Sequence, residues 1–275
     1  METLLKTRNV IAFLLGLWGL YEASAHDTWL LPKVFRLKAE QRTVISFTSG
    51  MVFPTNNFAI KPERIDQAFV FLAGEKTQLA KRESTPKALE FPIMPPNVGV
   101  ATAFVSLQPK TLDLKPSLVR EYLAEIGASD SLKAVWKNIP NTDTSAHWRE
   151  SYTKHAKTYI FVGEEKSYAQ DSSWKQSCGL VLEILPEVHP GLLRAKTDFP
   201  VRVLLGGKPL AYFPLGCVRE GSKNGTLQTT DANGRVRVKL PQKGRYLLRG
   251  TLLKPSDTSM LDWQSNFSTL TVEVR

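Results

Sequence analysis

Short apolar runs, rich in β-branched and aromatic residues and bounded by Gly, Pro, Asn or Ser, recur along most of the chain. Such runs are typical of β-strands. Residues 116–138 instead have helical periodicity, since Tyr122 and Ile126 belong to a series of apolar residues at helical spacing. Pro116 stands at the start of this series and Gly127 interrupts it. The pattern predicts a mainly β protein with one helical segment.

A polar, turn-rich stretch, Glu164–Ser177, divides the strand-like runs into two groups. We expect residues 26–165 to form an N-terminal β-rich, sandwich-like domain that contains the helical segment near 116–138. Residues 176–275 contain only strand-like runs at the spacing of a β-sandwich. We therefore expect them to form a C-terminal immunoglobulin-like β-sandwich.

The first 25 residues have a different pattern. Lys6 and Arg8 precede an apolar run, Val10–Tyr21, and small residues follow up to Ala25. This order is typical of a secretory signal peptide, and the run is too short to span a bilayer as a helix. We expect cleavage after Ala25 and a soluble, periplasmic mature protein. The alternatives are an uncleaved N-terminal anchor and a core helix.

The charge and the motifs of the sequence restrict the function classes that we expect. The formal net charge is +10, but the Lys and Arg residues are scattered and no nucleic-acid-binding motif is present, so nucleic acid is not an expected partner. The sequence contains no GxSxG, HExxH, P-loop or GxGxxG motif. We therefore do not expect an enzyme.

The candidate metal ligands centre on His26, the first residue after the predicted cleavage site. Its α-amine and imidazole could both bind Cu(II) or Ni(II), which favour tetragonal nitrogen and oxygen sites. Asp27 could add a carboxylate, and His155 is the first candidate for a second imidazole, followed by His147. The alternative is that His26 only follows the signal peptide and packs with Trp29 on the first strand.

The stretch RESYTKHAKTY is strongly polar although buried-looking sequence surrounds it. In it, Arg149, Glu150, Tyr152 and Lys157 could form a buried network or a polar wall of a ligand site. The alternative is an internal salt bridge that fixes the junction between helix and strand.

The two cysteines, Cys178 and Cys217, each lie beside strand-like sequence. In an exported protein such a pair could form a disulfide. The alternative is two separately buried thiols.

Several motifs occur in an order that resembles the domain of unknown function 4198 family of bacterial periplasmic proteins, often labelled NikM-like, periplasmic component of nickel or cobalt uptake. The resemblance implies an N-terminal β-rich region followed by an immunoglobulin-like sandwich, and a role in metal uptake. Two positions where family members commonly carry histidine have none here, in FTSGMVFP and YLLRGTLL. The motifs are AHDTWLLP, PERI, REYLAEIG, RESYTKHAKTYIFVG, GLVLEILP, VRVLLGGKPLA, TTDANGRVRVKLPQKGRYLL and DWQSNFSTLTVEV.

Together these features predict a periplasmic accessory or binding protein. Its expected ligand is a transition metal ion (nickel, cobalt or copper) or a small molecule, bound for uptake or handling. The expected partner is a membrane transporter or another envelope protein. The alternative is a metal-free, immunoglobulin-like interaction module that binds an envelope protein or a glycan.

Overall fold

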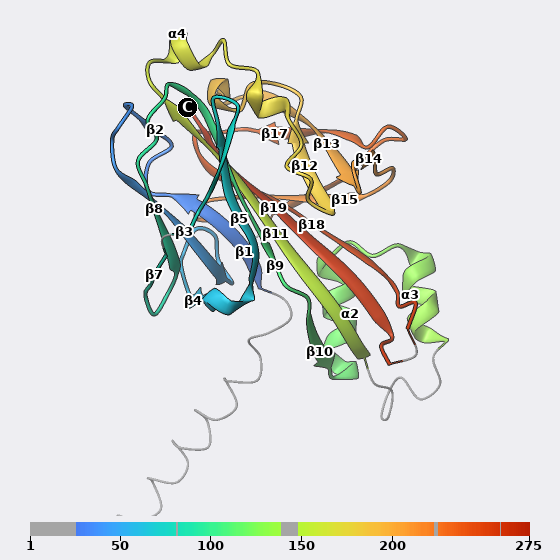
Figure 1. Cartoon of the computed structure of the whole chain (residues 1–275). Coiled ribbons are helices and arrows are strands. Elements are labelled where there is room, and N and C mark those ends of the chain that lie inside the picture. Colours follow the sequence, from blue (N-terminus) through green and yellow to red (C-terminus); the bar gives the residue numbers. More distant parts are fainter. Residues whose placement is uncertain (1–25, 81, 139–147, 223–224, 259) are drawn as a thin grey trace, which may run out of the picture.

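The computed structural model describes residues 26–80, 82–138, 148–222, 225–258 and 260–275 (Figure 1). The predicted signal peptide and His147 lie outside these ranges. The predicted fold class is confirmed, because strands in several sheets make up most of the described residues and helices are few. Among these residues, no helix has both the length and the apolar character needed to cross a membrane.

The largest sheet of the described chain has ten strands and includes strands from both predicted domains. Their bounds are β2 Arg36–Leu37, β5 Ile65–Leu72, β6 Glu75–Gln78, β9 Gly99–Leu107, β10 Lys110–Leu114, β11 Trp148–Val162, β15 Pro214–Arg219, β16 Thr226–Thr229, β18 Gly244–Pro255 and β19 Trp263–Val274. The order is β16-β15-β18-β19-β11-β9-β5-β6, and β10 and β2 also pair with β11. At the centre, β11 and β19 lie parallel and side by side (Figure 1).

A second sheet covers one face of the N-terminal part of this large sheet. Its alternating side chains build a core with β5, β9 and β11 that includes Leu30, Phe47, Phe91 and Ile160. This alternation is the pattern expected of a sheet with one buried face. The strands are β1 Asp27–Pro32, β3 Thr43–Gly50, β4 Phe58–Ala59, β7 Glu83–Ser84 and β8 Leu89–Ile93.

A third sheet forms the C-terminal sandwich with β15, β18 and β19. Its core includes Phe199, Val238, Leu248 and Val272. In its last strand exposed and buried residues alternate strictly, as expected of a sheet that covers a core on one side. The strands are β12 Leu182–Pro186, β13 Thr197–Leu205, β14 Lys208–Pro209 and β17 Arg235–Leu240.

Strand β11 belongs to both sandwiches. Neighbouring residues of a strand point to opposite faces, and here Ile160 and Val162 enter the N-terminal core while Tyr159 and Phe161 enter the C-terminal core. The apolar residues at the end of β11 are therefore buried on both sides. One strand thus connects the two predicted domains within a single sheet.

Two helices lie over the opposite end of β11, β18 and β19, as Figure 1 shows: α2 (Pro116–Glu125) and α3 (Asp130–Lys137). Proline at the first position favours the start of α2, and the Ser129 hydroxyl caps α3 by accepting from Leu132 N at 3.2 Å. Aromatic residues hold the helices on the sheet, with the rings of Trp148 and Trp263 stacked 4.5 Å apart. The remaining short helices are α4 Glu165–Tyr168, η2 Pro62–Arg64, η3 Ser173–Lys175 and η4 Pro190–Leu192.

Candidate functional site

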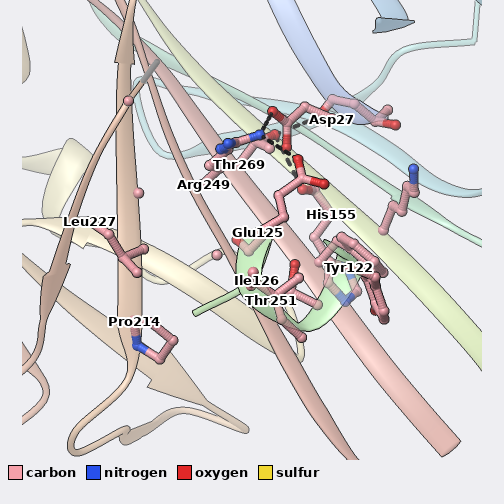
Figure 2. Close-up of a pocket in the computed structure, with 18 of the residues that line it drawn as sticks. Asp27, Tyr122, Glu125, Ile126, His155, Pro214, Leu227, Arg249, Thr251 and Thr269 are labelled. Carbon is pink, nitrogen blue, oxygen red and sulfur yellow. Dashed lines mark hydrogen bonds and ion pairs between the residues drawn. The ribbon is translucent and has the colours of Figure 1, made fainter. Parts of the chain in front are cut away.

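A cavity of about 160 Å³ lies on one face of the large sheet, between the start of β1 and the end of α2. We call it the β1–α2 cavity (Figure 2). Strands β11, β18 and β19 form its floor, and the hairpin of β15 and β16 closes its far side. Residues of the N-terminal sandwich, the helices and the C-terminal sandwich therefore meet there. The lining includes Asp27, Thr28, Tyr122, Glu125, Ile126, Lys154, Pro214, Leu227, Arg249, Thr251, Phe267 and Thr269.

Arg249 links three elements across the mouth of the cavity. Its Nη1 donates to Asp27 Oδ2 of β1 at 2.5 Å and to Glu125 Oε1 of α2 at 3.2 Å, as the dashed lines in Figure 2 show. The Asp27 and Glu125 side chains are 19% and 33% exposed. Burial raises the pKa of both carboxyls, and Arg249 reverses only part of that increase. The single guanidinium therefore compensates the two negative charges incompletely.

Lys154 is a second cation in the cavity and is only 6% exposed. Its Nζ donates to the backbone oxygen of His26 at 2.7 Å and lies 5.2 Å from the centre of the Phe267 ring. In the described part of the chain, no carboxylate lies within ion-pair distance of this ammonium group. Burial lowers the pKa of Lys154 to about 8, although the charge of Asp27 partly opposes this.

Lys157 lies three residues further along β11, on the opposite face of the sheet, and provides the contrast. It is 1% exposed, and its Nζ donates to Glu183 Oε1 at 2.8 Å. Burial disfavours its charge, but Tyr159 and Glu183 raise the pKa of Lys157 above its usual value. Glu183 also accepts hydrogen bonds from Ser177 Oγ and Cys178 N. Of these two buried lysines on one strand, only Lys157 is paired directly with a carboxylate, whereas Asp27, Glu150 and Glu125 act on Lys154 from beyond ion-pair distance.

Replacing Lys154 with methionine is expected to stabilise the fold near neutral pH. The folded state lowers the pKa of Lys154 from 10.5 to about 8. At about 1.4 kcal/mol per pKa unit, burial of the charge costs roughly 3 kcal/mol. The lost hydrogen bond to His26 offsets about 1 kcal/mol of the gain. We therefore expect Lys154→Met to gain about 2 kcal/mol at pH 7 in urea unfolding.

The stability gained by Lys154→Met should decrease as the pH rises. The unfolded chain keeps the Lys154 proton up to about pH 10.5, whereas the folded chain releases it near pH 8. The wild type therefore becomes more stable as the pH rises between these values, and the advantage of Lys154→Met shrinks over the same range. A difference between the two proteins that stays constant from pH 7 to pH 10 would contradict this account.

The structure does not bring the three predicted metal ligands together. Asp27 lines the cavity, and the His26 ring is buried and stacks on Phe58 with centroids 5.2 Å apart. His155 borders the cavity, but it directly follows Lys154 on β11. Its side chain therefore points to the face of the sheet opposite that of Lys154, whose ammonium group binds His26. There His155 Nε2 meets Asn266 Oδ1 at 3.3 Å. Among the described residues, no three His, Cys, Asp or Glu side chains form a group that could hold a metal.

The predicted polar cluster is also divided between the two faces of β11. Arg149 is exposed and pairs with Asp262 at 3.5 Å, and Lys157 pairs with Glu183. Glu150 and Tyr152 point to the other face. The four residues are therefore separate structural contacts rather than one network or one wall.

Glu150 is fully buried at the base of α2. Its carboxylate accepts from Trp148 Nε1 at 2.7 Å, from Tyr122 OH at 3.0 Å and from Ser265 Oγ. These donors come from β11, α2 and β19, so Glu150 fixes the helix to the sheet. Burial raises the pKa of Glu150, and the bonds from Ser265, Trp148 and Tyr122 oppose that increase.

The disulfide that the sequence allowed is not formed in the structure. Cys178 and Cys217 are free, buried thiols in two different hydrophobic clusters. Burial raises the pKa of each thiol to about 12. Both cysteines therefore act as small apolar side chains.

Sequence analysis missed Glu125, Lys154 and Arg249 as site residues. Lys154 lies in the polar stretch of β11, and alternation along this strand could have separated it from His155. Arg249 is a lone charge within the apolar run YLLRGTLL, which is a usable signal. No local signal marks Glu125, because its role depends on the position of α2 over the sheet.

The fold and this cavity define a mainly β protein with a charged site where its parts meet. The chain belongs to the family described as Domain of unknown function (DUF4198), whose model matches residues 23–252. None of the curated proteins compared with the chain matches it significantly.

Three solved structures illustrate the weak structural similarity of this chain to known proteins. The D0-D1 domain of intimin has 10% identity and a TM-score of 0.22, covering 90% of this chain and 98% of that one. The adhesin InvE of Yersinia pseudotuberculosis has 12% identity and a TM-score of 0.22, covering 88% and 58%. The titin I-band fragment I67-I69 has 8% identity and a TM-score of 0.21, covering 92% and 66%. Scores of this size assign no function to the chain.

Proposed function

We propose that this protein is an exported binding protein that holds a small polar molecule in the β1–α2 cavity. The observation that carries the proposal is the placement of charged side chains from β1, α2, β11 and β18 around one cavity. Binding sites are typically concave, largely apolar, and provided with a few converging polar groups. Ile126, Leu227 and Phe267 supply the apolar part of this lining.

We propose binding rather than catalysis, because hydrogen bonds within the protein fix both cations of the cavity in position. Arg249 is engaged by two carboxylates and Lys154 by a backbone oxygen. The signal-peptide pattern supports action in the periplasm after cleavage. A membrane transporter or another envelope protein would then receive the bound molecule.

The residues present do not fit a metal ion as the ligand. His26 and Asp27 are neighbours, but the His26 ring stacks on Phe58 and His155 points to the opposite face of the sheet. Arg249 also occupies one oxygen of Asp27. The nickel or cobalt role implied by the family label therefore has less support here than an organic ligand.

The test is a thermal-shift screen of small polar metabolites. It uses protein that has been exported and processed by the cell. Wild type is compared with Thr251→Trp, which fills the cavity, and with Thr111→Trp, which places the same side chain at an exposed position of β10. A ligand that stabilises the wild type and Thr111→Trp, but not Thr251→Trp, supports the proposal. Stabilisation by Ni(II), Co(II) or Cu(II) alone, or equal stabilisation of Thr251→Trp, would contradict it.

A further inference from the structure

We infer that the ligand of the β1–α2 cavity is a small zwitterion, with an anionic group that binds Lys154 and an ammonium group that faces Asp27 and Glu125. This inference rests on the proposed function and specifies the chemical class of the ligand. It follows from charges that the protein itself leaves incompletely paired.

The anionic group is assigned by the environment of Lys154. Buried lysines are normally paired, and Lys157 on the same strand follows that rule through Glu183 at 2.8 Å. Lys154 is almost as deeply buried, lines the cavity, and donates to the neutral backbone oxygen of His26. An ammonium group has three donors. A ligand carboxylate in the cavity would supply the missing negative partner.

The ammonium group is assigned by the opposite side of the cavity. Asp27 and Glu125 share one nitrogen of Arg249, which leaves one oxygen of each carboxylate for a ligand. Glu125 is also the last residue of α2, and the C-terminal end of a helix carries partial negative charge. Both features favour a positively charged group beside Glu125.

Charge balance favours a ligand with both groups over one with a single charge. The side chains that line the cavity include two cations, Arg249 and Lys154, and two carboxylates, so a ligand with a net charge would add one uncompensated charge to a partly buried site. A zwitterion adds one charge of each sign. The apolar side chains of Ile126 and Leu227 can then contact the carbon chain between the two groups.

The test uses calorimetric titration of the mature protein with glycine, β-alanine, 4-aminobutyrate and 5-aminopentanoate, which separate the two charges by increasing lengths. Butyrate and butylamine are the single-charge controls. Phosphate buffer is required, because common sulfonate buffers are themselves zwitterions. We expect at least one amino acid of the series to bind about tenfold or more tightly than both controls.

The variants identify the two binding groups. We expect Lys154→Met and Glu125→Gln each to weaken binding of that amino acid by about tenfold. Glu75→Gln, which makes the same change at an exposed carboxylate of β6 outside the cavity, should leave the affinity unchanged. Folding of Lys154→Met is not in question, since the substitution removes an unpaired buried charge.

The outcomes separate this inference from the proposed function. Butyrate or butylamine binding as tightly as the amino acids, or full affinity in Lys154→Met, overturns the zwitterion and leaves the cavity as a binding site. The zwitterion is likewise overturned, and the cavity kept as a binding site, if the metabolite screen finds an uncharged ligand whose binding Thr251→Trp abolishes. If the amino acids do not bind and the screen finds no ligand sensitive to Thr251→Trp, the inference and the proposed function both fail.

Discussion

Replacing Lys157 with methionine is expected to destabilise the protein by about 3–5 kcal/mol, the usual cost of removing one member of a buried ion pair. The substitution leaves the Glu183 carboxylate, which is 1% exposed, without its cation. Ser177 Oγ and Cys178 N still donate to Glu183, but neither carries a charge. The measurement is the free energy of unfolding in urea at pH 7.

Lys154→Met is the matched control, because it makes the same substitution at a buried lysine of the same strand. The two variants should change stability in opposite directions. Adding Glu183→Leu to Lys157→Met should restore much of the loss, since an apolar replacement of both partners is often nearly neutral. Equal effects of the two single substitutions would show that Glu183 does not compensate Lys157.

The second large effect is expected for Glu150→Leu. This change removes the common acceptor of Trp148 Nε1, Tyr122 OH and Ser265 Oγ, and leaves these buried donors without it. Each unsatisfied buried donor costs about 1–3 kcal/mol, so the loss should reach about 3 kcal/mol or more. Glu150→Gln keeps an acceptor oxygen of similar shape and should cost about half as much.

The loss of stability in Glu150→Leu should be greatest at α2, because Glu150 joins this helix to β11 and β19. Hydrogen exchange of the α2 amides is expected to accelerate in Glu150→Leu more than exchange in β13, which lies in the distant third sheet. Unchanged protection of α2 would mean that the aromatic cluster of Trp136, Trp148 and Trp263 holds the helix without Glu150.

Local pattern was sufficient to predict most elements. The strands follow from alternation and from Gly and Pro at their ends, and the helical segment near 116–138 corresponds to α2 and α3. The parallel pairing of β11 with β19 could not be predicted in this way, because it joins segments far apart in the chain. No local pattern specifies such a partner.

The candidate site shows the same limit at the level of single residues. In the stretch KHAK, Lys154 and Lys157 look equivalent, but their environments depend on Glu183, Arg249 and the first strand. The position of His26 directly after the predicted cleavage site made it a candidate metal ligand. In the folded protein its backbone oxygen holds Lys154, whereas its ring packs on Phe58.

The shared strand β11 also limits how the protein can move. Two-domain binding proteins commonly close around a ligand by rotating one domain about a hinge. Here such a rotation would shear the pairing of β11 with β19 and open two hydrophobic cores at once. Access to the cavity therefore requires a local change at the ion pairs of Arg249 with Asp27 of β1 and Glu125 of α2, since these side chains can rearrange while the sheet stays intact. We therefore expect a ligand to enter by rearrangement of side chains rather than by closure of two domains.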